Sequence, residues 1–261
     1  MLRKYPRTHH LAGSRLQPGD EDMNSVAFAG IRDRFLVVEE KLDGANTAVS
    51  FGADGTLRLQ SRGHYLTGGP RERQFGPFKA WAASIQHDLF ARIGDRHVVY
   101  GEWMYAKHTV FYDALPHYFC EFDVLDRATG TFLSTARRRE LLDGLAISSV
   151  PVLHSGSVAS LRELTSLAGP STCRTPHWRA ALLEAARQSG VDPDRATTET
   201  DMHEEMEGLY IKVETADAVA ERCKWVRPTF LTAVLDSGSH WADRPIVANR
   251  LADPAVMYGG L

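Results

Sequence analysis

The chain has 261 residues, 43% of them hydrophobic, which is enough to bury a core in one large domain or two modest ones. Its 30 Lys and Arg residues face 33 Asp and Glu residues, and the formal net charge of -3 excludes a global attraction to nucleic acid or anionic membranes. Three widely spaced cysteines without a C-x-x-C pair, and no apolar stretch near the ~18 residues of a membrane helix, predict a cytoplasmic protein with no membrane contact.

The first part of the chain predicts strands joined by turns and one long helix. Residues 1–30, rich in Pro, Gly, Ser, Asp and His, are interpreted as an irregular leader that packs on the domain. Apolar and β-branched runs at 35–40, 47–51 and 56–62 predict a β-meander with a lysine at its first bend. Apolar residues at helical spacing then predict a helix over 73–93.

The second part continues this mixture of strands and helices. In chain order, the patterns predict a strand at 97–103, a strand at 117–125, helices at 161–167 and 178–188, and strands at 208–213 and 220–226. Hairpin strands with helices grouped between them favour an α+β domain built on antiparallel sheets over a doubly wound parallel sheet. We expect this domain to cover residues 1–230, and 231–261 to form a short C-terminal extension with no room for a barrel-shaped OB-fold domain.

The most informative segment is Glu40-Lys41-Leu42-Asp43-Gly44, with Asn46 two residues beyond it. It places a lysine between a strand end and a glycine turn, with carboxylates on both sides. A surface lysine beside acids is ordinarily a solvated ion pair, so this K-x-D-G segment alone would not indicate a catalytic site. Its significance comes from the short segments that follow it in order, each at a strand or a strand end: Ser61-Arg62-Gly63, Tyr100-Gly101-Glu102-Trp103, Phe122-Asp123, Glu207-Gly208-Leu209-Tyr210-Ile211-Lys212 and Arg222-Cys223-Lys224-Trp225.

This ordered series resembles the covalent nucleotidyltransferase superfamily of polynucleotide ligases and capping enzymes. It is most similar to the ATP-dependent RNA ligases related to phage T4 RNA ligase 2, and the resemblance spans residues 36–227. It implies that the Lys41 amine attacks the α-phosphorus of ATP, expels pyrophosphate and carries AMP. AMP would then pass to a 5′-phosphate, and a 3′-hydroxyl would displace it and seal the strand.

The resemblance also implies roles for the other motif residues. Arg62 and Glu102 match positions that contact the nucleotide, and Phe122 matches the residue that stacks on adenine. Glu207 matches a ligand of the divalent metal, Mg²⁺ or Mn²⁺. The other nucleotide-binding positions carried over are Glu40, Asp43, Gly44, Asn46, Lys212, Arg222 and Lys224.

The last motif departs from the family pattern. The family usually has two lysines separated by one residue, whereas this chain has Arg222 in the first position and Lys224 in the second. An arginine keeps the charge and can contact phosphate through two nitrogens, but it cannot lose a proton. Arg227 could share the role of Arg222 instead.

A lysine nucleophile has to be uncharged, and an ordinary pKa of about 10.4 leaves only about one lysine in 2,500 neutral at pH 7. The site is therefore expected to depress the pKa of its lysine. The cations expected to do so are a bound divalent metal together with Arg62, Lys212 and Lys224.

RNA is the expected partner, as a nicked duplex or an RNA/DNA hybrid. Two basic clusters are candidates for contacting its phosphates, although each also fits an ordinary solvated face: Arg71, Arg73 and Lys79 after the Gly68-Gly69 turn, and the run Arg137-Arg138-Arg139. Because no segment explains strand recognition, a separate end-healing or strand-recognition protein could accompany the chain.

Three alternative functions stay open. A DNA or hybrid nick ligase and a GTP-using capping enzyme belong to the same superfamily, but they generally carry a further barrel domain, for which there is no room after Arg227. The third alternative is a nucleotide-binding subunit that has lost catalysis. The presence of Lys41, Glu102 and Glu207 disfavours it.

Overall fold

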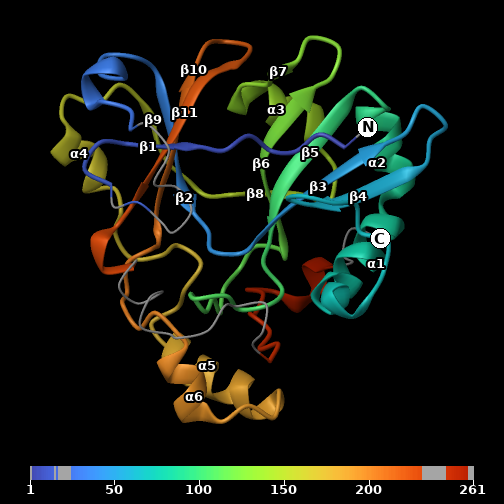
Figure 1. The fold of residues 1–261 in the computed structure, drawn as a ribbon, viewed down its shortest axis with the longest axis vertical. Coiled ribbons are helices and arrows are strands. Elements are labelled where there is room, and N and C mark those ends of the chain that lie inside the picture. The colour runs from blue at the N-terminus through green and yellow to red at the C-terminus, as the bar shows by residue number, and fades with distance from the viewer. Residues whose placement is uncertain (1, 15, 17–24, 231–244, 258–261) are drawn as a thin grey trace.

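The computed structural model describes residues 2–14, 16, 25–230 and 245–257, and these residues form two facing β-sheets (Figure 1). The first sheet has the strand order β1 (His9–His10), β11 (Val219–Val226), β10 (Gly208–Glu214), β2 (Leu36–Lys41) and β9 (Val152–Gly156). The second has the order β4 (Leu57–Ser61), β3 (Ala45–Phe51), β5 (His97–Trp103), β6 (Phe119–Asp126) and β7 (Thr131–Phe132), with β8 (Ser148–Ser149) beside β6. Apart from β1 on β11 and β8 on β6, the paired strands are antiparallel, which confirms the predicted α+β class.

Short helices complete the described part of the chain. They are η1 (Phe28–Gly30), η2 (Pro70–Phe75), α1 (Gly76–Ser84), α2 (Gln86–Ile93), α3 (Thr135–Leu142), α4 (Leu161–Thr165), α5 (Trp178–Gln188), α6 (Pro193–Thr198) and η4 (Pro254–Met257). Among the described residues, no helix has the length and apolar character needed to cross a membrane.

The first sheet has one apolar and one polar face. Leu209 and Ile211 of β10 pack on the outer side, in a cluster that includes Leu164 of α4. Because side chains alternate along a strand, Tyr210 and Lys212 point the other way, towards the second sheet. The charged residues that alternate with apolar ones in β10 therefore face the space between the sheets.

The second sheet is buried on both faces. Helices α1 and α2 cover its outer face (Figure 1), where Phe78 and Trp81 pack against Phe51 and Phe119. Its inner face contributes Tyr100 and other apolar residues to a separate cluster between the sheets. Packing on both faces thus holds this sheet in place, and with it the side chains on its inner face.

The predicted meander is wrong at its first bend. Strands β3 and β4 form a hairpin as expected, but β2 pairs with β10 and β9 and so belongs to the other sheet. Residues 42–44 are a crossover between the two sheets rather than a hairpin turn. Antiparallel pairing between strands far apart in sequence decides this arrangement, and local patterns do not report it.

Two other predictions need correction. The helix predicted over 73–93 is divided into η2, α1 and α2, with a break at Ile85. The leader is not wholly irregular, because His9 and His10 form β1 and pair in parallel with Cys223 and Lys224. The described part of the C-terminal segment, 245–257, packs on the same domain, where Asn249 accepts a 2.9 Å hydrogen bond from the Tyr112 amide.

Gly208 is required by the close approach of β10 and β11. A Cβ atom there would lie 2.0 Å from the Trp225 carbonyl oxygen. We expect Gly208→Ala to lower the free energy of unfolding by about 1–3 kcal/mol, because backbone atoms would have to move. Denaturant titration measures this loss, and Gly169→Ala, where nothing lies within 4 Å of the new methyl group, should stay close to wild type. Equal stability of both variants would contradict the prediction.

Candidate active site

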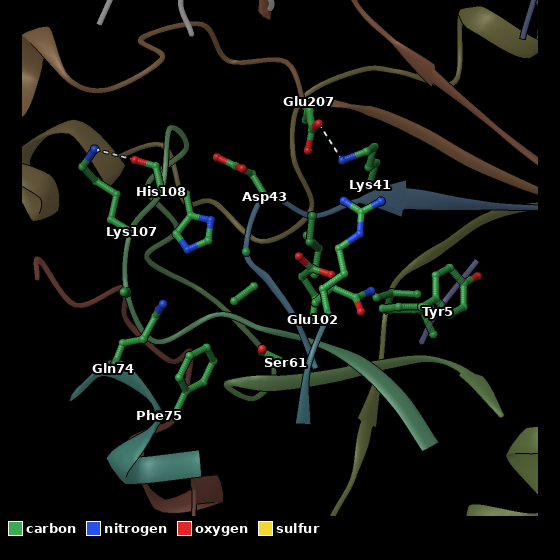
Figure 2. A pocket seen from close by; sticks show the side chains of 18 of the residues that line it. Tyr5, Lys41, Asp43, Ser61, Gln74, Phe75, Glu102, Lys107, His108 and Glu207 are labelled. Atoms are coloured by element: carbon green, nitrogen blue, oxygen red, sulfur yellow. Dashed lines mark hydrogen bonds and ion pairs between the residues drawn. The ribbon is translucent and has the colours of Figure 1, made fainter. Parts of the chain in front are cut away.

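A cavity of about 1260 Å³ lies between the two sheets (Figure 2). Its size exceeds the upper end of the ~300–1,000 Å³ typical of small-molecule sites. All the predicted site residues except Lys212 and Arg222 line it: Glu40, Lys41, Asp43, Gly44, Asn46, Arg62, Glu102, Phe122, Glu207 and Lys224. The structure therefore gathers motifs that are far apart in sequence around one space.

Lys41 is the last residue of β2 and stands where the chain crosses between the sheets. The crossover runs close to the end of β5, and a Cβ atom on Gly44 would lie 2.5 Å from Met104 Sδ and 2.8 Å from the Trp103 carbonyl oxygen. Only glycine fits this passage without displacing its neighbours. The glycine of the K-x-D-G motif thus allows the chain to pass from β2 of the first sheet into β3 of the second sheet, beside the cavity.

The Lys41 amine is held by carboxylates. Its Nζ donates a 2.6 Å hydrogen bond to Oε1 of Glu207, whose side chain is 2% exposed. Burial alone would lower the pKa of Lys41, but the carboxylates of Glu207, Glu102 and Asp43 outweigh burial and hold this pKa above its ordinary value. In the protein without bound nucleotide and metal, acids rather than cations surround the amine, so the expected depression of this pKa depends on the bound metal.

Asp43 anchors a loop. Its Oδ2 accepts hydrogen bonds of 2.7 and 2.8 Å from the backbone amides of Thr109 and Val110, in the segment after β5. The same segment brings Lys107 and His108 to the cavity wall. The K-x-D-G aspartate therefore shapes the site through the backbone it holds.

Glu40 is also an anchor. Its carboxylate accepts hydrogen bonds from Ser171 Oγ at 2.5 Å and from the amide and hydroxyl of Thr172 at 3.0 and 2.5 Å. The side chain is 1% exposed. Although Glu40 lines the cavity, its carboxylate oxygens are hydrogen-bonded to Ser171 and Thr172 and so hold that segment in place.

Lys212 lies outside the cavity lining, in a buried network of charges. Its amine donates to the Phe122 carbonyl oxygen and lies 3.0 Å from Glu39 Oε2 and 3.1 Å from Asp123 Oδ1. Its side chain is fully buried. Because Glu39 belongs to the first sheet and Asp123 to the second, Lys212 joins the sheets.

Neither arginine proposed to pair with Lys224 lines the cavity. Arg222 lies over the Phe132 ring, 3.9 Å from its centre, and its Nε is 3.9 Å from Asp123 Oδ2. Arg227 forms an ion pair with Asp201, and its Nε donates a 2.8 Å hydrogen bond to the Met206 carbonyl oxygen. Of the last motif, Lys224 is the residue that reaches the site.

The run Arg137-Arg138-Arg139 is not a single basic surface. Arg138 is fully buried, with its guanidinium ion-paired to Glu39 and, at 2.6 Å, to Glu121. Arg137 is paired with Asp217 and Glu140. The middle arginine therefore belongs to the charge network that joins the sheets, and it cannot contact phosphates.

The members of the other basic cluster, Arg71, Arg73 and Lys79, do not share one environment. Arg73 is exposed and lines the cavity, whereas the amine of Lys79 forms a 2.6 Å ion pair with Glu72. The Arg71 side chain lies outside the described part of the structure. Arg73 is thus the member of this cluster that the structure places beside the site.

Tyr5, a leader residue that the sequence patterns did not single out, forms a wall of the cavity next to Phe122. The two rings meet edge to face with centres 5.1 Å apart. The Tyr5 hydroxyl hydrogen-bonds to Asp123 and, at 2.5 Å, to the Tyr210 hydroxyl. A tyrosine in an irregular segment carries no spacing signal, so only the tertiary structure assigns it to the site.

No group of three or more His, Cys, Asp and Glu residues within the described ranges is placed to hold a metal ion by itself. The carboxyl groups of Glu102 and Glu207 nevertheless both lie near the Lys41 amine, since both raise its pKa. Two carboxylates suit a cation that also takes phosphate and water oxygens, as Mg²⁺ commonly does. The residues present therefore fit a metal that arrives with a phosphate ligand.

The Glu102 carboxyl should make stability depend on pH. Burial, reinforced by Glu207 and Asp43 and opposed by Lys41, raises the pKa of Glu102 from 4.5 to about 8. The folded protein then keeps a proton that the unfolded chain has lost, so stability falls as pH rises from about 5 to 8, by up to about 1 kcal/mol per pH unit.

Replacement of Glu102 by glutamine should reduce the decrease of stability between pH 5 and 8. It should also raise the Tm of the ligand-free protein at pH 8 by a few degrees. Thermal unfolding between pH 5 and 8.5 measures it. Exposed Glu205→Gln should keep the wild-type slope. A Glu102→Gln variant with the wild-type slope would refute a neutral carboxyl at this position.

The two facing sheets, with a lysine at the crossover and acids around it, define a nucleotidyltransferase-type domain. A family model described as RNA ligase matches residues 34–226, and the chain therefore belongs to the RNA ligase family. A search of curated protein sequences finds no significant match.

Solved structures of Naegleria gruberi RNA ligase share the fold. A variant determined with ATP and Mn superposes with a TM-score of 0.53 and 15% identity, covering 80% of this chain and 53% of the ligase. Two further variants, one with AMP and Mn and one with ATP and Mn, give TM-scores of 0.56 and 0.57 at 15% and 16% identity, each covering 90% of this chain and 59% of the ligase. The chain thus spans just over half the length of these ligases.

Proposed function

We propose that the chain is an ATP-dependent RNA ligase that seals 5′-phosphate and 3′-hydroxyl ends through an AMP adduct on Lys41 and an adenylylated 5′ end. The observation that carries this proposal is the position of Lys41, whose amine lies beside Glu207 in a cavity that the other motifs line. Membership of the RNA ligase family supports RNA as the substrate.

ATP and a divalent metal, Mg²⁺ or Mn²⁺, are the proposed cofactors. The Naegleria gruberi ligase with the same fold was determined with ATP and Mn or with AMP and Mn. Glu207 and Glu102 would hold the metal, whose positive charge would weaken the hold of these carboxylates on the Lys41 proton. Lys224 and Arg62 would face the phosphates, and Phe122 and Tyr5 would enclose the base.

The protein's own residues prepare the nucleophile. In the ligand-free site, the Lys41 proton lies in the 2.6 Å hydrogen bond to Glu207, and it has to leave before the amine can attack phosphorus. Glu207 fixes the amine at the crossover, and Asp43 fixes the loop on the opposite wall through Thr109. This positioning would align the amine with the α-phosphorus.

The finer assignments are proposals as well. Residues 1–230 would form the catalytic unit, a nicked duplex or RNA/DNA hybrid would be the substrate, and a separate strand-recognition or end-healing protein would be a partner. The three cysteines are free and buried, which supports the cytoplasm as the compartment.

Intact-protein mass measurement tests the proposal. With ATP and Mg²⁺ or Mn²⁺, the purified protein should gain the mass of one AMP, whereas GTP should give no adduct. A GTP adduct would indicate a capping enzyme, and no adduct at any metal or pH would indicate a subunit that only binds nucleotide. A matched panel of RNA, DNA and hybrid nicks then separates RNA sealing from DNA sealing.

A further inference from the structure

The loop segment between β5 and β6 is buried although it is irregular. Residues 104–118, all of them described, connect the two strands without a helix or strand of their own. Val110, Phe111 and Tyr112 within this segment are fully buried. Buried peptide groups need hydrogen-bond partners, which an irregular segment does not supply to itself. The partners therefore have to come from another part of the chain.

The described C-terminal segment, 245–257, supplies several of these partners. The Lys107 amide donates a 2.8 Å hydrogen bond to the Val247 carbonyl oxygen, and the Leu115 amide donates one of 3.0 Å to the Arg250 carbonyl oxygen. The loop segment is thus fixed by residues that lie at the other end of the sequence.

Asn249 joins two distant points of the loop segment. Its side chain accepts a 2.9 Å hydrogen bond from the Tyr112 amide and donates one of 2.7 Å to the Met104 carbonyl oxygen. Its own amide donates a 2.9 Å hydrogen bond to the Tyr105 carbonyl oxygen, and the residue is 1% exposed. A carboxamide offers a donor and an acceptor on one rigid group. Asn249 therefore fixes the separation between residues 104 and 112.

The loop segment closed in this way holds Asp43. The Asp43 amide donates a 2.9 Å hydrogen bond to the Tyr112 hydroxyl, and the Asp43 carboxylate accepts from the amides of Thr109 and Val110. Both a donor and an acceptor of this residue are thus tied to the loop segment. Because Asp43 lies two residues beyond Lys41, this attachment limits where the crossover can place the lysine.

We infer that Asn249 is a positioning residue for the transfer of AMP to Lys41. It fixes the loop segment whose Tyr112 hydroxyl and backbone amides hold Asp43, and Asp43 in turn holds the crossover that carries the lysine. This inference rests on the proposed function, and it extends the catalytic unit proposed above, 1–230, to Asn249. A misplacement of about 1 Å can slow a reaction by about 100-fold, so the alignment of the amine with the α-phosphorus should depend on these contacts.

The effect should be confined to one step of the reaction. The Lys41 amine is the nucleophile when AMP is taken from ATP. In the sealing of an RNA end that already carries AMP, the 3′-hydroxyl is the nucleophile instead. A positioning role for Asn249 therefore predicts slower formation of the AMP adduct and unchanged sealing of an adenylylated end, whereas a loss of folded protein would lower both rates alike.

The test measures both steps with the whole chain. Intact-protein mass follows the AMP adduct over a range of ATP concentrations, and a nicked RNA duplex with AMP already on its 5′ end reports sealing. Tyr112→Phe removes only the hydroxyl that binds the Asp43 amide. It should lower the adduct rate at saturating ATP by about tenfold and change the half-saturating ATP concentration by less than about threefold. Asn249→Ala should lower the adduct rate at least as much.

Two comparisons separate this role from a structural one. Both variants should seal the adenylylated end within about twofold of the wild-type rate at temperatures below their Tm. Tyr118→Phe is the matched control, because its hydroxyl donates a 2.8 Å hydrogen bond to the Asn249 carbonyl oxygen rather than to Asp43. It should form the adduct within about twofold of the wild-type rate.

Four outcomes would overturn the inference. They are a wild-type adduct rate in Tyr112→Phe, equal slowing of both steps in the variants, equal slowing by Tyr118→Phe and Tyr112→Phe, and a change confined to the half-saturating ATP concentration. The last would assign the contacts to ATP binding. Absence of the AMP adduct in wild type would instead refute the proposed function, so the two failures are distinguishable.

Discussion

Replacing Lys41 by arginine should abolish the AMP adduct, and replacing it by alanine should do the same. Arginine can keep the charge and the contact with Glu207, but its guanidinium does not lose a proton in proteins and cannot act as a nucleophile. Loss of a covalent nucleophile lowers rates by on the order of 10⁴-fold or more, so no mass gain should be detectable. Intact-protein mass and peptide mapping of the wild-type adduct measure this.

Lys79→Arg is the matched control, because Lys79 also forms a 2.6 Å ion pair with a glutamate but lies outside the cavity lining. It should gain AMP at the wild-type rate. An adduct on the Lys41→Arg variant, or mapping of the wild-type adduct to another residue, would refute the assignment of the nucleophile. The arginine variant is the more informative one, because alanine would also remove the positive charge that pairs with Glu207.

Removing Arg138 should give the largest loss of stability. Arg138 is fully buried between Glu39 of the first sheet and Glu121 of the second. Arg138→Met would leave two buried carboxylates short of one counter-charge, which should lower the free energy of unfolding by about 3–5 kcal/mol and the Tm by roughly 10 °C. Denaturant and thermal unfolding measure the two quantities.

The neighbouring Arg139 provides the control, since it is exposed on the same helix. Arg139→Met should change stability by no more than about 0.5 kcal/mol. The double variant Arg138→Met with Glu121→Gln should recover part of the loss, because one unpaired charge is removed with its partner. Equal effects of Arg138→Met and Arg139→Met would mean that the buried pairs do not stabilise the fold.

Much of the fold could be predicted from local patterns. The apolar alternation of β10 and the boundaries of α5 match the structure closely, because the apolar side chains of each pack together in one cluster. The partner of β2 could not be predicted, since β2 pairs with strands more than a hundred residues away. Strand pairing at that distance depends on the whole fold, and the β2 segment itself carries no sign of it.

Motif order indicated residues that the structure brings together. Glu102 and Glu207 are far from Lys41 in sequence but close to its amine in the structure. The same order includes Lys212, which lies among buried acids outside the cavity lining. A motif lists residue types and does not reveal whether a charge faces a ligand or a buried acid. Tyr5 lies in an irregular part of the leader, where no spacing rule applies.

The crossover after Lys41 has a mechanical consequence. Only Leu42, Asp43 and Gly44 separate the end of β2 from the start of β3, so a group bonded to the Lys41 amine would sit at the seam where the two layers join. An attached nucleotide would therefore lie in the cavity against residues of both layers. A nucleic-acid end that reaches such an adduct would also have to approach both sheets.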